Sequence, residues 1–507
     1  MNIKEAKEDI RNTVEAYLKK NEYGHYDIPE IHQRPLLLMG PPGIGKTQIM
    51  EQIARECGIG LVSYTITHHT RQSAVGLPFI KEKQYGGRTW SVTEYTMSEI
   101  LASIYQYMED TEKKEGILFI DEINCVSETL APTMLQFLQC KTFGNQSVPR
   151  GWIIVAAGNP PEYNRSVHDL DFVTLDRVRR MDVDADLAVF REYAREVNIH
   201  PFILSYLELR PGNFYRVESD VDGLQFVTAR GWEDLSRLIR VYEELDLPVN
   251  ESVIGQFLQH REIAMDVAAY YDLYQKYRGD YDISRILAGQ AGSGIYARLF
   301  HASFDERLSL VELLHDGLHT YLSRALAECD MTREAYQFLK EYREGLRDRT
   351  ADEGLYRSLI DQKRQSRLQS EKTGLITAEE STFHARLLSL LASWSPDEAS
   401  SPKEAFMAVK GHFDRQCQDQ DKAVDLAMAG LDHAFDFMEN AFSQGEEMVV
   451  FVTELTMDPS ASRFITENGC DRYFKYNQSL HIGSRRSAIL ADIKKDAIYQ
   501  DASSWEF

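Results

Sequence analysis

A glycine-rich octapeptide near the N-terminus, Gly40-Pro-Pro-Gly-Ile-Gly-Lys-Thr47, constrains the fold more than any other segment. It matches the pattern G-x-x-x-x-G-K-[ST], whose backbone N–H groups surround a phosphate chain. The preceding run 35–39 is short and apolar, as in a buried strand, and residues 47–57 carry apolar side chains on one helical face. A strand, a glycine loop and the positive end of a helix are therefore predicted in the order that phosphate binding requires.

The side chains of this loop have distinct expected roles. Lys46 would reach the terminal phosphates of a nucleoside triphosphate, and the Thr47 hydroxyl would be a ligand of Mg²⁺. The remaining positions expected to contact the nucleotide are Gly40, Pro41, Pro42, Gly43, Ile44, Gly45 and Gln48. Because a glycine-rich loop alone can be an ordinary turn, the prediction depends on further motifs.

A second motif is the apolar run Ile117-Leu-Phe-Ile-Asp-Glu122, a predicted strand that ends in two carboxylates. Asp121 is suited to organising the metal ion, and Glu122 to polarising the attacking water. The predicted strand 152–157 is followed by Gly158-Asn159-Pro160, and Asn159 would orient the same water. Asn-Pro is also a routine turn signal, but its place directly after an apolar strand favours the functional interpretation. Together the motifs predict a chain that binds and hydrolyses a nucleoside triphosphate.

Length and charge limit the alternatives. A chain of 507 residues is too long for one hydrophobic core, so roughly two to four domains are expected. The net charge of −23 and the pI near 5.1 argue against tight, sequence-independent binding to nucleic acid, which needs a basic surface.

The cysteines and the apolar runs indicate the cellular compartment. Six cysteines, at positions 57, 125, 140, 329, 417 and 470, are far apart and form no C-x-x-C or Cys/His cluster, which favours reduced thiols over disulfides or zinc. Residues 1–9 lack the apolar stretch of a signal peptide, and no apolar run approaches the ~20 residues that cross a bilayer. We therefore expect a soluble, cytoplasmic protein with no membrane segment.

The pattern along the chain predicts an α/β core followed by helices. An N-terminal helix is expected within 1–33, and the short apolar runs 35–39, 59–66, 117–120, 152–157 and 178–183 predict a parallel sheet covered on both faces. A β-hairpin is expected at 79–93, turning at Gly86-Gly87. The predicted domains are the N-terminal helix at 1–33, a nucleotide-binding core at 34–185, a helical lid at 186–265 and a large α-helical region at 266–507.

Taken as a set, the motifs resemble those of an AAA+ ATPase. The matching segments are Gly40–Thr47, Asp121-Glu122-Ile123-Asn124, Ala157-Gly158-Asn159-Pro160 and Leu175-Asp176-Arg177. The set is similar to the MoxR branch, in the group with a hairpin insertion that also contains magnesium-chelatase subunits, dynein-type modules and McrB-type GTPases. The hairpin expected at 79–93 falls where that insertion belongs. The resemblance covers roughly residues 34–245, under half of the chain.

The resemblance implies a role for each matching residue. Lys46 and Thr47 correspond to the Walker A lysine and Mg²⁺ ligand, Asp121 and Glu122 to the Walker B pair, Asn159 to sensor 1, Arg177 to the arginine finger and Arg230 to sensor 2. An arginine finger acts on the nucleotide of a neighbouring subunit, so a homo-oligomeric ring, usually of six subunits, is implied. ATP and Mg²⁺ are the implied cofactors.

Two positions depart from the family pattern. Many MoxR relatives continue Asp-Glu-Ile-Asn with Arg, where this chain has Cys125. After the finger they commonly place Phe, where this chain has Val178, followed by Arg179 and Arg180. Arg177 is the predicted finger because its Leu-Asp-Arg context matches, with Arg179 and Arg180 as alternatives.

By resemblance, such a protein uses ATP hydrolysis to remodel or chaperone a partner protein, often one with a von Willebrand factor A domain. A McrB-type GTPase motor that works with a nuclease is an alternative, since these motifs do not separate ATP from GTP. A nucleotide-gated assembly scaffold with little turnover is another. Nucleic acid and membrane partners are not expected.

Three further segments have structural interpretations. His68-His69 lacks partners at metal-ligand spacing and is expected to lie in a loop. The run Tyr270-Tyr-Asp-Leu-Tyr-Gln-Lys-Tyr277 is expected to be a packing surface rather than a platform for stacking bases. The polar, partly basic stretch 361–372 is expected to be a solvated helix face or a linker.

Overall fold

The computed structural model describes residues 1–68, 72, 74, 76–126, 130–143, 146–163, 172–220, 223–347, 354–372, 376–396, 401–443 and 445–479. These residues fall into two compact units, the first formed by Met1–Arg191 with Pro211–Ala264 and the second by Glu192–Arg210 with Met265–Phe507. The four-domain division expected from the sequence stays a prediction. His69, half of the predicted loop pair, lies outside the described residues.

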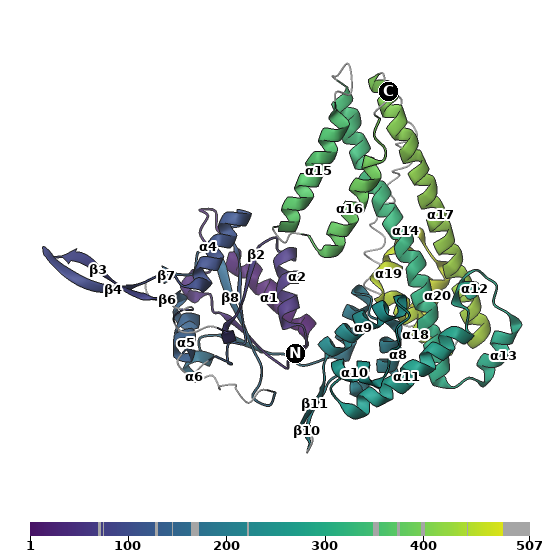
Figure 1. Ribbon diagram of the computed structural model, residues 1–507, viewed down its shortest axis with the longest axis horizontal. Helices are drawn as coiled ribbons and strands as arrows, with labels where there is room; N and C mark the ends of the chain where they lie inside the picture. The colour runs from purple at the N-terminus through teal and green to yellow at the C-terminus, as the bar shows by residue number, and fades with distance from the viewer. Residues whose placement is uncertain are drawn as a thin grey trace. The chain divides into compact units, whose positions relative to one another are not determined.

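A parallel sheet lies at the centre of the first unit (Figure 1). Within the described residues it has five strands in the order β2-β5-β8-β1-β9. Their bounds are Gly60–Thr65 for β2, Gly116–Asp121 for β5, Trp152–Gly158 for β8, Leu36–Met39 for β1 and Arg179–Asp182 for β9. Each matches one of the predicted apolar runs, which confirms the predicted α/β fold class. Because β8 pairs with both β5 and β1, the ends of these three strands meet at one edge.

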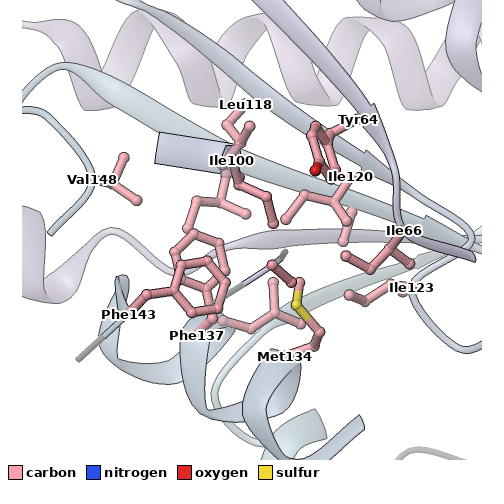
Figure 2. Packing of buried hydrophobic residues seen from close by; sticks show 14 of the residues in the cluster. Tyr64, Ile66, Ile100, Leu118, Ile120, Ile123, Met134, Phe137, Phe143 and Val148 are labelled. Atoms are coloured by element: carbon pink, nitrogen blue, oxygen red, sulfur yellow. The ribbon is translucent and has the colours of Figure 1, made fainter. Parts of the chain in front are cut away.

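Strand residues alternate between two hydrophobic clusters, one on each face of the sheet. One cluster takes Leu37, Met39, Leu118, Ile120, Ile154 and Ala156, and the other takes Leu36, Leu38, Ile117, Phe119, Ile153 and Val155. Helices α4 (Glu99–Thr111) and α5 (Ala131–Cys140) complete the first cluster, part of which is seen in Figure 2. Helices α1 (Ile3–Leu18) and α2 (Lys46–Glu56) complete the second. Both faces of the sheet are therefore covered, as a parallel sheet requires.

The described part of the first unit also contains three antiparallel hairpins. The predicted one is formed by β3 (Pro78–Tyr85) and β4 (Arg88–Tyr95), and it projects from the sheet between β2 and β5 in the chain (Figure 1). A short one is formed by β6 (Thr142–Phe143) and β7 (Gln146–Ser147). The third, β10 (Arg216–Asp220) with β11 (Gly223–Val227), lies in the segment 186–265 that the sequence predicted to be a helical lid, between two of its expected helices. The hairpin was not anticipated because each strand has only five residues and β10 contains a single apolar residue, Val217.

The other helices assigned to this unit are mostly short. They are η1 (Glu30–His32), η2 (Ile66–His68), α6 (Phe172–Leu175), α7 (Leu187–Glu196, which continues into the second unit), η3 (Pro211–Asn213), α9 (Ala229–Glu244) and α10 (Glu251–Phe257). Trp232 of α9 is fully buried, and its indole N–H donates to the carbonyl oxygen of Phe214 at 2.9 Å. This contact fixes the start of α9 against the segment that follows η3.

The second unit is helical throughout its described residues, which confirms the predicted helical C-terminal region. Its helices are α8 (Pro201–Leu209), α11 (Arg261–Asp280), α12 (Ile283–Leu287), α13 (Ser293–His301), α14 (Phe304–Leu346), α15 (Leu355–Lys372), α16 (Ala378–Ala392), α17 (Pro402–Phe442), α18 (Glu446–Met457), α19 (Pro459–Asn468) and α20 (Asp471–Ser479). Over the described ranges, no helix combines the length and apolar character needed to cross a membrane.

Two long helices, α14 and α17, run antiparallel through the second unit (Figure 1). Their direction follows from their contacts, because Tyr336 meets Phe413 with ring centroids 6.2 Å apart, whereas Gly430 lies against Tyr321. The tyrosines of α11 at 270, 271, 274 and 277 are buried, and Tyr271 meets Phe202 of α8 edge to face. The tyrosine run is therefore a packing surface, as predicted.

A buried ionic cluster joins α14 and α18 to the C-terminal part of α7, which belongs to the second unit. Arg195 donates through Nε to Glu454 and through Nη2 to Glu312, both at 2.6 Å, and all three side chains are almost fully buried. Burial opposes the charge of the guanidinium, but the two carboxylates outweigh burial and raise the pKa of Arg195. Burial raises the pKa of Glu312. The cluster fixes the end of α7 relative to α14 and α18.

Replacing Phe137 with Ala should destabilise the first unit by about 3–5 kcal/mol, because the ring is fully buried and a cavity would remain. Its ring stacks on Phe143 with centroids 4.0 Å apart (Figure 2). Urea unfolding of the full chain, followed by a probe in the first unit, measures the change. The matched control is Phe172→Ala, since Phe172 is 82% exposed. Equal unfolding midpoints for the two variants would contradict the packing described here.

Candidate nucleotide site

The loop between β1 and α2 has a backbone that requires glycine. Gly43 and Gly45 have φ of +74° and +96°, in the left-handed region that side-chain-bearing residues avoid. At Gly40 a Cβ atom would lie 2.4 Å from the carbonyl oxygen of Val183, so no larger residue fits. Gly45 is also the N-cap of α2, whose first residue is Lys46. The N–H groups of the loop and the positive end of α2 therefore form a site suited to an anion.

Two residues at the start of α9, Thr228 and Arg230, contact this loop. The backbone N–H of Arg230 donates to the carbonyl oxygen of Gly43 at 3.2 Å, and a Cβ at Gly43 would be 3.1 Å from Thr228. Thr228 caps α9 by accepting a hydrogen bond from Gly231. The start of α9, where the sequence placed sensor 2, therefore lies directly against the glycine loop. The side chain of Arg230 itself is exposed.

A second contact to the loop comes from Tyr215, which sequence reasoning missed. Its hydroxyl donates to the carbonyl oxygen of Pro42 at 2.9 Å, and its ring meets Tyr163 edge to face. Burial, followed by the influence of Tyr163, raises the pKa of Tyr215. No motif marks a tyrosine 173 residues away in the chain, so only the fold could identify it.

Lys46 is buried, with only 8% of its surface exposed. Its ammonium group donates to the carbonyl oxygens of Gly40 and Pro41, both at 2.8 Å, and to Oδ1 of Asn159 at 2.9 Å. Burial lowers the pKa of Lys46 to about 8, a change that Asp121 opposes and Arg230 reinforces. A buried ammonium bonded only to neutral oxygens favours an anionic ligand, which is the chemistry of a terminal phosphate.

Thr47 and the end of β5 form the candidate metal site. The Thr47 hydroxyl donates to Oδ2 of Asp121 at 3.2 Å, and the N–H of Glu122 donates to the other oxygen, Oδ1, at 2.9 Å. Glu122 has a φ of +57°, so the backbone turns sharply directly after the strand. Among the described residues no three His, Cys, Asp or Glu side chains could hold a metal by themselves. One hydroxyl and one carboxylate suit Mg²⁺, which completes its shell with phosphate oxygens and water.

Asn159 is fixed by Asn124, a residue to which the sequence motif gave no role. The Asn124 amide donates to the carbonyl oxygen of Asn159 at 2.8 Å and accepts from the Asn159 N–H at 3.3 Å. Asn124 is buried, and a Cβ at Gly158 would lie 2.6 Å from its side-chain oxygen. The two asparagines therefore join the turn after β5 to the end of β8. The available signal was an Asn two residues after the Asp-Glu pair.

The three candidate finger arginines differ in their contacts. Arg179 donates to the Thr13 hydroxyl at 2.6 Å and pairs with Asp9 at 3.6 Å. Arg180 pairs with Asp182 at 2.8 Å. Arg177, after α6, is exposed and donates to the neutral side-chain amide of Gln139.

The fold brings most of the predicted site residues together. The contacts above link the glycine loop, with Lys46 and Thr47, to Asp121, to Asn159 and to the start of α9 at Arg230. Glu122 is adjacent to Asp121. Gln48 also lies at the loop, since its side-chain oxygen would be 3.3 Å from a Cβ at Gly45. Arg177 is the exception, because none of its contacts among the described residues reaches this group. That position is compatible with action on another subunit.

A comparison with known families agrees with this geometry. Residues 36–171, about a quarter of the chain, match the family model of the ATPase family associated with various cellular activities (AAA). The match runs from β1 past the end of β8 and includes Lys46, Asp121, Glu122 and Asn159. The segment is therefore an AAA ATPase domain, and the corresponding enzymatic activity is ATP hydrolysis. No curated protein matches the chain.

Replacing Asn124 with Ala should lower the turnover number for ATP about ten- to hundredfold, because Asn159 loses the two hydrogen bonds that fix it. Nucleotide affinity should change little, since Asn124 touches neither the loop nor Lys46. Steady-state phosphate release and nucleotide titration measure the two effects. Asn468→Ala, which removes an amide bonded to the Phe464 carbonyl of α19, is the matched control. Equal turnover in both variants would exclude a positioning role for Asn124.

Proposed function

We propose that this chain is a MoxR-like AAA+ ATPase, in which a ring of subunits couples ATP hydrolysis to the remodelling of a partner protein. A protein with a von Willebrand factor A domain is the partner class that the MoxR resemblance indicates. The proposal of ATP hydrolysis rests on one observation. At the ends of three adjacent parallel strands, hydrogen bonds connect Asn124 to Asn159 and Asn159 to Lys46, beside the hydrogen bond between Thr47 and Asp121.

Each side chain has a proposed task in attack of water on the γ-phosphoryl group. Lys46 and the loop N–H groups would hold the terminal phosphates and neutralise charge. Thr47 and Asp121 would hold Mg²⁺, which supplies further neutralisation when bound. Glu122 would polarise the attacking water, and Asn159, kept in place by Asn124, would orient it.

The β3–β4 hairpin supports the MoxR-like part of the proposal. Its chain position between β2 and β5 is that of the insertion in the resembling group. Its side chains are mostly exposed, including Ile80 at 75% and Trp90 at 55%, so they do not serve the core of the first unit. Exposed apolar side chains on a projecting ribbon suit contact with another polypeptide.

Arg177 supports sites shared between subunits. Arg179 and Arg180 neutralise carboxylates of the same chain, so using either on a neighbouring nucleotide would break an existing pair. Arg177 has an exposed guanidinium bonded to an amide, and that bond can be exchanged for a phosphate at little cost.

Replacing Glu122 with Gln should abolish hydrolysis while ATP binding stays intact, because the amide cannot polarise water but preserves the shape of the site. Calorimetric titration with ATP and GTP in the presence of Mg²⁺, together with phosphate release, tests this. The same variant, locked with ATP, should retain the partner in a pull-down. Normal hydrolysis by Glu122→Gln would refute its role, exclusive binding of GTP would favour the McrB-type motor, and negligible turnover by the parent protein would favour a scaffold.

Mixing two inactive variants tests the shared site. Lys46→Ala and Arg177→Ala should each be inactive alone, the second because a finger is worth about 10³–10⁵ in rate. When they are mixed in equal amounts and allowed to reassemble, about a quarter of the interfaces would pair an intact Lys46 with an intact Arg177. Phosphate release should therefore reappear in the mixture.

The matched control is a mixture of Lys46→Ala with Arg180→Ala, in which the second variant should already be active alone. If Arg177→Ala turns over like the parent protein, the finger assignment is wrong. If the mixture of Lys46→Ala and Arg177→Ala stays inactive although both variants assemble, the two residues do not act across an interface.

A further inference from the structure

A cavity of about 150 Å³ lies among α14, α15 and α16 in the second unit, apart from the AAA domain. These helices pack on one another, with α15 and α16 side by side (Figure 1). Lys363 and Arg367 of α15 and His384 of α16 contribute to its polar wall, and Leu387 and Leu388 contribute apolar surface. A cavity of this volume accommodates a molecule of roughly the size of benzene.

Arg367 shows that the cavity is not simply a packing defect. Its Nε atom is buried and has no hydrogen-bond partner among the described residues. Its Nη1 atom makes one long hydrogen bond, 3.4 Å, to the carbonyl oxygen of Ser381, which holds the side chain in place. A buried, unsatisfied donor on a cation costs stability. The guanidinium that lines the cavity is therefore incompletely satisfied, and an anion in the cavity would compensate its charge through the atoms that face the cavity.

The charge of α15 also favours an anionic ligand. The helix carries five basic residues, at 357, 363, 364, 367 and 372, against the two acidic residues Asp361 and Glu371, in a chain whose net charge is −23. Among the described residues the one ion pair of Lys363 is long, 3.8 Å to Glu341, whereas Arg364, which does not line the cavity, pairs with Asp361 at 3.0 Å. The less well neutralised of these two cations thus faces the cavity.

We propose that this cavity binds a small phosphate-bearing anion, either inorganic phosphate or a short phosphate monoester. The planar guanidinium of Arg367 presents parallel N–H groups that match phosphate oxygens, and Lys363 adds a second positive charge. Leu387 and Leu388 would cover the carbon atoms of an ester. Glu334 of α14, which also lines the cavity, would accept a hydrogen bond from an ester hydroxyl.

Calorimetric titration of the full chain tests the proposal in a Lys46→Ala background, which weakens phosphate binding at the glycine loop. The titrants are inorganic phosphate, glycerol 3-phosphate and, as the uncharged comparison, glycerol. One site per chain should bind the first two and not glycerol. Tighter binding of glycerol 3-phosphate would identify an ester as the preferred form, and equal binding would identify the phosphate group as the whole determinant.

Adding Arg367→Ala should weaken phosphate binding about ten- to hundredfold, because hydrogen bonds to a charged group contribute that much to affinity. Arg364→Ala, which removes the same charge one helical turn away, is the matched control and should leave affinity unchanged. Lys363→Ala provides a second lining variant if Arg367→Ala does not fold. Absence of a saturable site, or equal affinity in the lining variants and Arg364→Ala, would overturn the proposal. This result is independent of hydrolysis at the AAA domain.

Discussion

The buried ammonium group of Lys46 is the constraint on which the site in the first unit depends. Three neutral oxygens hold it, two from the loop backbone and one from Asn159. Burial lowers its pKa to about 8, which means that the fold keeps a cation where a cation is disfavoured. A phosphate chain beside Lys46 would offset that cost, so the free energy of burial is available for binding the anion.

This constraint limits which residues can surround Lys46. The carbonyl oxygens of Gly40 and Pro41 point at Lys46 from a loop in which Gly43 and Gly45 adopt left-handed backbone conformations. Asn159 reaches the same ammonium because β8 lies between β1 and β5 in the sheet. The parallel sheet thus converts three separate strand ends into one polar edge, as expected for ligand sites in open α/β folds.

Sequence reasoning predicted the parts of this arrangement that are local in the chain. The glycine loop, the carboxylates of Asp121 and Glu122, and Asn159 each follow an apolar run, so spacing and periodicity were enough to predict them. Tyr215 could not be predicted, because its contact with Pro42 depends on the path of the whole chain. The β10–β11 hairpin was missed because its strands have only five residues each, and a single apolar residue in β10 gives no alternating pattern.

The buried cluster in the second unit shows the same limit in a stronger form. In the sequence Arg195 and Glu312 have mostly polar neighbours at helical spacing, as surface charges do, whereas Glu454 has Val450, Phe451 and Met457 there. Their contacts join positions 117 and 259 residues apart, so no local pattern reveals them. Burying such charges gains little net stability over apolar residues of equal volume, but removing one partner leaves an uncompensated charge. Any other register among α7, α14 and α18 would leave a buried charge without its partner. Hydrophobic contacts alone would tolerate such a shift.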